Sequence, residues 1–471
     1  MESKLMRPAL LALLVAAGLA GCASSVPPPK LDLPTPEGVA APAELGQWWQ
    51  SLNAPTLNAL IEEAQAHNAD VLIAMESVGQ SRATLRQAQV ALLPDVNATL
   101  NATRRNPSDL TGQPGKTGTS TVYNGGLSVS YELDLWGRVW KAKDAALANL
   151  LASQYARETT RSAVAAQTAR SYFTLLAADA EIALLTQTLN TRNEALTLEQ
   201  KRFKAGAVGE YELKLSEAEQ ASVAAALPQM VAAREKAEAA LAVLLGRSPK
   251  DVMEGHVDRG NGLTLLAAAP EIPAGLPADL LTRRPDVRRA EAQLAVAHAS
   301  LEETRRRYFP SLTLTGFLGG ESPSLGDLFN APARTWNIAG QLLQPIVGMA
   351  NIDAQVEAAK ASRNQAELGY AQAARTAYAD VRSALAAHTA ARETLVATEA
   401  RANAQAKVKE LADMRYKAGV SSYLDQLNAE RDRLSAERDR VSALQGRLTA
   451  LVDVYQALGG GWQQQDIAST K

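Results

Sequence analysis

Two very long stretches of the chain carry the hydrophobic pattern of α-helices. Residues 138–205 contain no glycine or proline, and residues 350–418 are interrupted only by Gly369. Both stretches are far longer than a helix in a globular core, so each predicts a helix of roughly 100 Å at about 1.5 Å per residue. Charged residues scattered along the first stretch exclude a membrane-spanning helix. Its heptad seam is formed by Leu175, Ile182, Leu189, Leu196 and Phe203.

Four shorter segments alternate apolar and polar residues with a period of two, which is typical of strands with one apolar and one polar face. They lie at about residues 95–105, 123–135, 311–318 and 336–345. Strands of about ten residues have the length that a tilted strand needs to cross a bilayer. We therefore expect membrane strands. A soluble antiparallel sheet packed on a core is the alternative.

The chain contains an internal duplication. Residues 69–94 match residues 285–310 at an offset of 216, and residues 201–217 match residues 414–430 at an offset of 213. Two matches at nearly the same offset predict two copies of one structural unit.

Each copy is expected to hold a helix, two strands and a long helical hairpin. The first copy spans residues 48–265 and the second spans residues 266–462. Gly206 and Gly419 mark the expected hairpin turns, because glycine suits the left-handed residue that ends a helix. The returning helices are expected at residues 210–245, with an interruption at Pro228, and at residues 423–458.

Four strands per chain cannot close into a barrel, and an open sheet edge is not tolerated in hydrocarbon. Closure therefore requires several chains. Three copies would give about twelve strands, a size that leaves a water-filled lumen. The strand pattern by itself does not distinguish three copies from two or four.

The N-terminal region has the pattern of an export signal. Residues 1–21 combine basic residues with a short apolar run, as in a secretory signal peptide. The segment Leu19-Ala20-Gly21-Cys22 resembles a bacterial lipobox, which predicts a lipid on Cys22, the only cysteine. An ordinary cleaved signal with an unrelated cysteine is the alternative. Residues 22–47, rich in proline, alanine and serine, predict an extended lipid-anchored tether, and residues 463–471 a flexible tail.

Composition excludes several functional classes. The formal net charge of -2 gives no indication of a nucleic-acid partner. No phosphate-binding loop or nucleophile elbow is present, so we expect neither an enzyme nor a cofactor. No apolar run outside the signal is long enough for a transmembrane helix. The histidines are too dispersed in sequence to predict a metal site: His67, His256, His298 and His388.

These features together resemble the outer membrane factors of Gram-negative tripartite efflux pumps, the TolC-like and OprM-like family, and the resemblance covers nearly the whole mature chain. It rests on the order and spacing of several short motifs. They are the lipobox at residues 19–22, Trp48-Trp49, Arg283-Arg284-Pro285-Asp286-Val287-Arg288, Gln344-Pro345, Tyr416-Lys417-Ala418-Gly419-Val420 and Leu458-Gly459-Gly460-Gly461-Trp462.

The resemblance implies a mainly α-helical homotrimer with a membrane β-domain. A twelve-stranded β-barrel, four strands from each chain, would lie in the outer membrane and continue into a long α-helical barrel across the periplasm. The protein would be a palmitate-bearing lipoprotein and a passive exit duct for drugs or other small toxic compounds. It would open when a periplasmic adaptor and an inner-membrane transporter of the RND or ABC type dock.

The resemblance also implies a gate at the periplasmic end of the second hairpin. Leu424 and Asp425 match its aperture ring, and three carboxylates at close range would attract cations. Asn428 stands where the family has a second aspartate, which leaves a single acidic ring. Arg431 matches an arginine near the gate of OprM-like members. Tyr416 matches a tyrosine that hydrogen-bonds an acid on the neighbouring hairpin, here Glu212, and Ser421 replaces a gate arginine of TolC-like members.

Two other functions remain open from the sequence. The same fold could be the exit duct for protein or peptide secretion of type I. A lipid-anchored periplasmic coiled-coil protein would explain the long helices but not the paired strands. The sequence of a duct carries little information about its cargo, which remains open.

Overall fold

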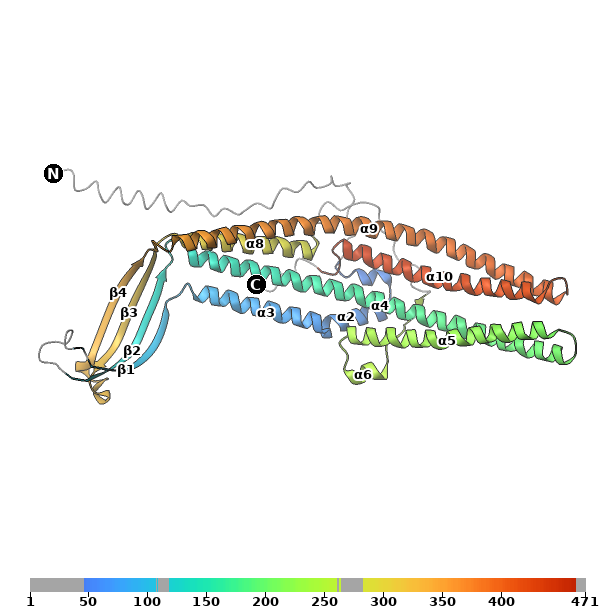
Figure 1. Ribbon diagram of the computed structural model, residues 1–471, viewed down its shortest axis with the longest axis horizontal. Helices are drawn as coiled ribbons and strands as arrows, with labels where there is room; N and C mark the ends of the chain where they lie inside the picture. Colours follow the sequence, from blue (N-terminus) through green and yellow to red (C-terminus); the bar gives the residue numbers. More distant parts are fainter. Residues whose placement is uncertain (1–45, 107, 109–117, 261, 264–282, 463–471) are drawn as a thin grey trace. The chain divides into compact units, whose positions relative to one another are not determined.

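The computed structural model describes residues 46–106, 108, 118–260, 262–263 and 283–462. The predicted signal peptide, Cys22, nearly all of the tether and the C-terminal tail lie outside the described residues. The expected boundary between the two units at residues 265 and 266 also lies outside them. The described chain is mainly helical, with one four-stranded sheet (Figure 1).

The first repeat leads from short helices through two strands into a helical hairpin. Its third helix starts where the side chain of Asn68 accepts a hydrogen bond from the amide of Asp70 at 2.9 Å, the geometry of an N-cap. The elements are η1 (Trp48–Leu52), α2 (Pro55–His67), α3 (Ala69–Val90), β1 (Asp95–Arg105), β2 (Ser120–Leu133), α4 (Arg138–Lys204), α5 (Glu210–Leu244) and α6 (Pro249–Glu254).

The second repeat has the same order of a helix, two strands and a hairpin. Its first helix begins at a proline, which is favoured at this position because the missing N–H would have no partner there. The elements are α8 (Pro285–Arg306), β3 (Ser311–Ser322), η3 (Leu325–Asp327), η4 (Ala331–Ala333), β4 (Arg334–Leu343), α9 (Met349–Lys417) and α10 (Tyr423–Ala457).

The two long helices have nearly equal lengths, 67 residues in α4 and 69 residues in α9. The hairpins α4–α5 and α9–α10 pack along their lengths, and α10 also contacts α4. One apolar core joins η1, α2, α4 and α10, where the rings of Trp48 and Tyr455 stack with centroids 5.4 Å apart. This core fixes the two repeats to each other near the middle of the long helices.

All four strands form one antiparallel sheet in the order β1-β2-β3-β4 (Figure 1). β1 and β4 are therefore its two edges. The register places the alternating apolar residues of every strand on one face, as in the cross-strand row Ala98, Leu127, Leu318 and Trp336. The adjacent row on the opposite face is Asn97, Ser128, Phe317 and Asn337.

The observed elements differ from the expected ones in the bounds of three strands and in the continuity of one helix. β2 ends at Leu133 because the chain turns there, with the Leu135 amide bonded to the Leu133 carbonyl at 2.8 Å. β3 continues to Ser322, and β4 begins at Arg334 and ends before Pro345, which has no N–H to donate. The expected interruption at Pro228 was wrong. α5 is continuous through it, packed along α4, and only one hydrogen-bond donor is lost.

Four glycines meet where β2 and β3 pair: Gly125 lies opposite Gly320 and Gly126 lies opposite Gly319. A Cβ atom on Gly126 would come within 2.6 Å of the Gly319 Cα, and one on Gly319 within 2.8 Å of the Gly126 Cα. The two backbones approach too closely for any side chain. We call these four residues the glycine square.

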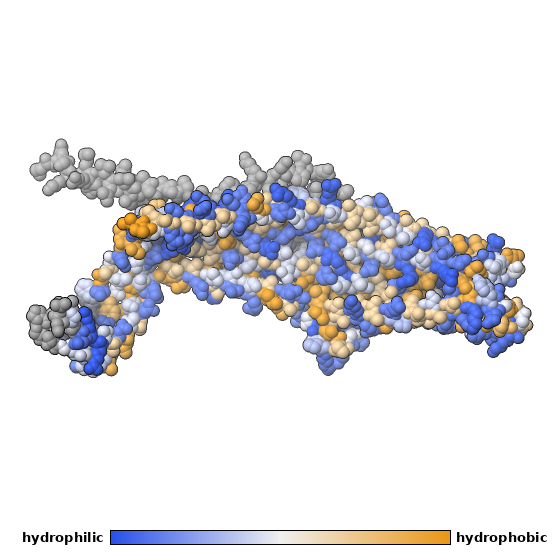
Figure 2. Space-filling model, in the orientation of Figure 1, coloured by the Kyte–Doolittle hydropathy of each residue, from blue (hydrophilic) through white to orange (hydrophobic). Residues whose placement is uncertain are grey.

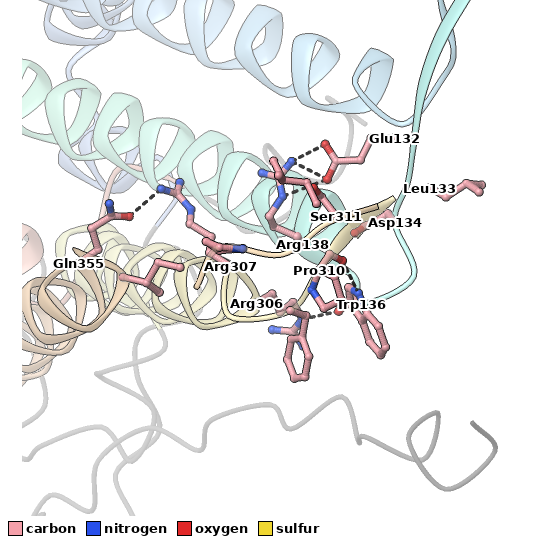
Figure 3. Close-up of a pocket in the computed structure, with 14 residues that line it drawn as sticks. Glu132, Leu133, Asp134, Trp136, Arg138, Arg306, Arg307, Pro310, Ser311 and Gln355 are labelled. Atoms are coloured by element: carbon pink, nitrogen blue, oxygen red, sulfur yellow. Dashed lines mark hydrogen bonds and ion pairs between the residues drawn. The ribbon is translucent and has the colours of Figure 1, made fainter. Parts of the chain in front are cut away.

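Ion pairs and hydrogen bonds fix the sheet to the helices (Figure 3). Arg138, the first residue of α4, binds Glu132 through two nitrogens. It also binds Glu303 of α8. The indole N–H of Trp136 donates to the Pro310 carbonyl at 2.8 Å, and Arg306 donates to the Trp136 carbonyl at 2.8 Å. A cavity of about 410 Å³ is lined by Glu132, Trp136, Arg138, Arg306 and Pro310, among others. The junction therefore orients both strand pairs on the helices.

Within the described residues, no helix combines the length and apolar character required to cross a membrane. Hydrophilic residues are spread over the helices on the visible face, and a hydrophobic patch lies where α9 begins (Figure 2). Ile346 and Val347, just before α9, are 78% and 95% exposed.

Candidate gate at the hairpin tips

Both hairpins turn through the same backbone motif. Gly206 and Gly419 have φ angles of +71°, which side-chain-bearing residues rarely adopt. The Ala207 amide reaches the Arg202 carbonyl at 2.9 Å, and the Val420 amide reaches the Arg415 carbonyl at 3.0 Å. These bonds are those of the Schellman motif that terminates helices. The structure thus places both predicted turn glycines at hairpin turns.

The returning helices also begin alike, because an acid three residues inside each one folds back onto its first amide. Glu212 accepts from the Gly209 amide at 3.1 Å, and Asp425 accepts from the Ser422 amide at 3.0 Å. Ser422 completes a capping box by accepting from the Asp425 amide at 3.2 Å. The Ser422 hydroxyl and amide hold the pKa of Asp425 below its usual value.

The predicted aperture residues lie on the first turns of α10. Leu424 is 41% exposed, and Asp425 and Asn428 are also exposed. Their neighbours Tyr423 and Leu427 are buried against the rest of the chain. The burial of these two residues fixes the orientation of α10, so Leu424, Asp425 and Asn428 form one exposed surface at the tip.

The predicted pairing of Tyr416 with Glu212 does not occur within the chain. The Tyr416 hydroxyl accepts from Arg202 at 2.6 Å and donates to Glu199 at 3.3 Å, both on α4. Glu212 caps its own helix instead. The tyrosine still bonds an acid on the other hairpin, but the acid lies one helix away from the predicted one. Burial, and then the charge of Glu199, raise the pKa of Tyr416.

Two ion pairs join the hairpins above this point. The guanidinium of Arg192 on α4 lies 2.5 Å from the carboxylate of Glu430 on α10, and both side chains are largely buried. Arg431 on α10 pairs with Glu219 on α5. The hydrogen bond from Arg431 lowers the pKa of Glu219. Together with the contacts of Tyr416, these two pairs form the inter-hairpin contacts.

Sequence reasoning found Tyr416 and Arg431 but missed their partners. A second seven-residue series runs along α4, three residues after each position of the predicted leucine seam. Its buried members are Ala178, Leu185, Arg192 and Glu199. By contrast, Phe203 at the end of the leucine seam is 41% exposed. The signal was a pair of charged residues continuing an apolar seven-residue repeat.

Within the part of the chain that the structure describes, no cluster of three or more metal-binding side chains occurs. The site consists of exposed side chains at helix tips and ion pairs between helices. Such an arrangement can constrict a passage and change its width.

Comparisons with known proteins agree with these features. The profile of the outer membrane efflux protein family matches residues 60–247 and 276–460. The chain is 32% identical to the probable efflux pump outer membrane protein TtgC of Pseudomonas putida, over 92% of this chain and 88% of TtgC. It is 32% identical to the pyoverdine export outer membrane protein OpmQ of Pseudomonas aeruginosa, over 96% of this chain and 97% of OpmQ.

The fold has solved counterparts. The crystal structure of the CmeC outer membrane channel of Campylobacter jejuni superposes with a TM-score of 0.85 and 26% identity, covering 94% of this chain and 97% of CmeC. The predicted resemblance, and with it an outer-membrane exit duct rather than an enzyme, is confirmed. The chain belongs to the outer membrane efflux protein family.

Proposed function

We propose that three copies of the chain form the complete duct, a twelve-stranded barrel continued by a helical barrel. The observation that carries the proposal is the sheet itself, which has one apolar face and two edge strands, β1 and β4. Val96, Leu127 and Ile338 on that face are 57%, 50% and 78% exposed. Such a face suits lipid, but unpaired edges do not, so β4 of each copy pairs with β1 of the next.

The helices support the same assembly. The leucine seam of α4 becomes more exposed toward the tip, and Phe203 there is 41% exposed. A neighbouring copy would cover these side chains in a closed ring of hairpins. Leu424 and Asp425 of three copies would then meet on the axis, as an apolar ring beside a ring of carboxylates. Asn428 would face the same passage one turn further along α10.

The inter-hairpin contacts support a closed resting state. They join α9 and α10, the hairpin that carries the aperture, to α4 and α5. Opening would move the second hairpin away from the first and would break the pairs Arg192–Glu430 and Glu219–Arg431. A periplasmic adaptor and an inner-membrane transporter, of the RND or ABC type, would supply the binding energy for this shift.

The cargo of the duct is a small molecule in this proposal. TtgC is named as an efflux pump component and OpmQ as a pyoverdine exporter. We infer that this chain carries drug-like or other small toxic compounds. A lipid on Cys22 would anchor the protein to the membrane in addition to the barrel.

Assembly is tested by measuring the mass of the detergent-extracted protein by light scattering, with detergent subtracted. Three chains per particle are expected. Insertion into planar bilayers should then give ion-conducting channels. A stable monomer that retains its strand content would overturn the proposal.

A further inference from the structure

The register of the sheet separates two adjacent arginines at the outer end of β1. Arg104 lies opposite Thr121 and follows Leu100 and Ala102 on the apolar face, whereas Arg105 lies opposite Ser120 on the polar face. On β4, Arg334 lies opposite Gly320 and therefore shares the apolar face with Trp336. β1 ends and β4 begins on the side of the sheet away from the helices (Figure 1), so Arg104 and Arg334 lie at the outer rim of the lipid-facing surface.

Aromatic residues mark the limits of the lipid-facing band. On β2, Tyr123 and Tyr131 lie on the apolar face, separated by eight residues, or roughly 26 Å along a strand. Membrane barrels have an apolar band about 25 Å tall between two aromatic girdles. On β4, Trp336 is 71% exposed on the same face and lies in the cross-strand row of Leu127. Arg104 lies opposite Thr121, two residues beyond Tyr123 along β2. Arg334 lies two residues beyond Trp336 along β4. Each arginine is therefore on the outer side of an aromatic position.

The two arginines belong to the two edge strands. Arg334 lies in the same cross-strand row as Leu100, four residues before Arg104 on β1. Tilted strands in a closed barrel require such a stagger. The last residues of β1 and the first residues of β4 therefore reach the rim at similar height. When β4 of one copy pairs with β1 of the next, Arg334 and Arg104 come together across each subunit boundary. Both are exposed, and neither has an acidic partner among the described residues.

The connection between β3 and β4 folds onto the lipid-facing side. Leu328 is 1% exposed and its side chain would lie 3.1 Å from a Cβ atom on Gly125, on the face of Leu100. A Cβ atom on Gly320 would collide with the Leu328 carbonyl oxygen. The neighbouring Phe329 is 84% exposed. Gly125 and Gly320 of the glycine square thus make room for this segment against the sheet, and Phe329 is left exposed.

We propose that each subunit boundary binds the phosphorylated headgroup of lipid A, the glycolipid of the outer leaflet. Arg334 of one copy and Arg104 of the next hold a phosphate through charge-assisted hydrogen bonds, and Phe329 contacts an acyl chain. The guanidinium groups match the doubly charged headgroup, and the apolar segment matches its chains. The proposal rests on the trimer proposed above.

The test uses the full-length protein in detergent and native mass spectrometry with diphosphorylated lipid A. The double variant R104Q/R334Q should bind about tenfold less lipid than the unchanged protein, because two charge-assisted contacts are lost. The matched control is R105Q, which removes the adjacent charge from the opposite face and should bind normally. Monophosphorylated lipid A should bind more weakly, and inorganic phosphate should not displace the bound lipid.

Equal binding by R104Q/R334Q and the unchanged protein would overturn the proposal, as would an equal loss in R105Q. Displacement of the lipid by inorganic phosphate would show that the site binds free anions, and would also overturn the proposal. The same spectra report the number of chains, so failure of the trimer is seen separately. If the double variant does not assemble, the unchanged protein decides: binding that is insensitive to salt, or to loss of one lipid phosphate, contradicts the proposal.

Discussion

Arg192 and Glu430, 238 residues apart in the sequence, form a buried ion pair that joins the two hairpins of one chain. Their side chains are 4% and 15% exposed, and their charged atoms lie 2.5 Å apart. Desolvation of both ions offsets much of their attraction, so the pair adds little net stability. Removal of one partner leaves a buried charge unpaired. The pair therefore specifies how the hairpins fit together.

The first prediction concerns this pair. Glu430→Gln should destabilise the closed arrangement by about 3–5 kcal/mol, because Arg192 stays charged and buried. The double variant Arg192→Met with Glu430→Gln should recover part of that loss. Thermal unfolding and single-channel conductance measure both effects. Glu437→Ala, which breaks a pair within α10 only, is the control and should change neither quantity. Equal effects of the single and double variants would contradict the prediction.

A second prediction concerns Tyr416. Tyr416→Phe combined with Glu199→Gln should raise single-channel conductance, because hydrogen bonds to charged groups contribute about 1.5–3 kcal/mol each and are lost in three copies. Glu212→Gln should leave conductance unchanged, since Glu212 caps its own helix within the described chain. An increase in conductance in Glu212→Gln alone would show that Tyr416 bonds Glu212, the acid first predicted from the sequence.

A third prediction concerns cation binding at the aperture. Asp425→Asn keeps an oxygen that can accept from the Ser422 amide but removes the charge. Block of the channel by divalent cations from the periplasmic side should weaken, because the ring of carboxylates is gone. Glu212→Gln is the matched control, since it changes the equivalent capping acid on the other hairpin. Unchanged block in Asp425→Asn would place the constriction elsewhere.

A fourth prediction is a response to acid. The pKa of Glu219 is lowered from 4.5 by Arg431 while the hairpins are paired. The stabilisation is therefore complete above pH 4.5 and is lost as the pH falls through the lowered pKa. Conductance should rise as the pH is lowered below about 4.5. Glu219→Gln should show a higher conductance at neutral pH and a smaller change with acid. Equal acid responses in both proteins would exclude this pair as the cause.

A fifth prediction separates the lipid from the barrel. Cys22→Ser behind an unrelated cleavable signal should still fractionate with the outer membrane, because the apolar face of the sheet remains. Membrane fractionation and immunoblotting provide the measurement. A variant that is recovered in the soluble periplasmic fraction would mean that β1–β4 do not hold the protein in the membrane.

The sequence was most informative where one local rule decides the structure. The absence of glycine and proline predicted α4 and α9 to within one residue at each end. Alternation located all four strands, but it did not predict that β3 extends through Gly319 and Gly320, because glycine has no side chain to alternate. Backbone pairing with Gly126 and Gly125 decides that extension.

The contacts of the gate were harder to predict because they depend on which helices pack together. Arg192 and Glu199 are charged residues of the kind found on a solvated helix face. The structure buries them beside the second hairpin, where Glu430 of α10 pairs with Arg192 and Tyr416 of α9 bonds Glu199. Glu212 and Asp425 were chosen as gate residues, yet both carboxylates bond the start of their own helices. Local capping takes precedence for Glu212, while Asp425 also lies on the exposed surface of the tip.

The glycine square restricts where the barrel wall can be altered. A side chain at Gly126 or Gly319 must separate the two strand backbones, and a side chain at Gly125 or Gly320 must displace Leu328. Random diversification of the barrel should therefore recover almost no changes there, and many at Ser128 or Asn337 on the polar face. An engineer who wishes to turn this duct into a sensing pore would place the recognition group at those two residues and leave the glycines unchanged.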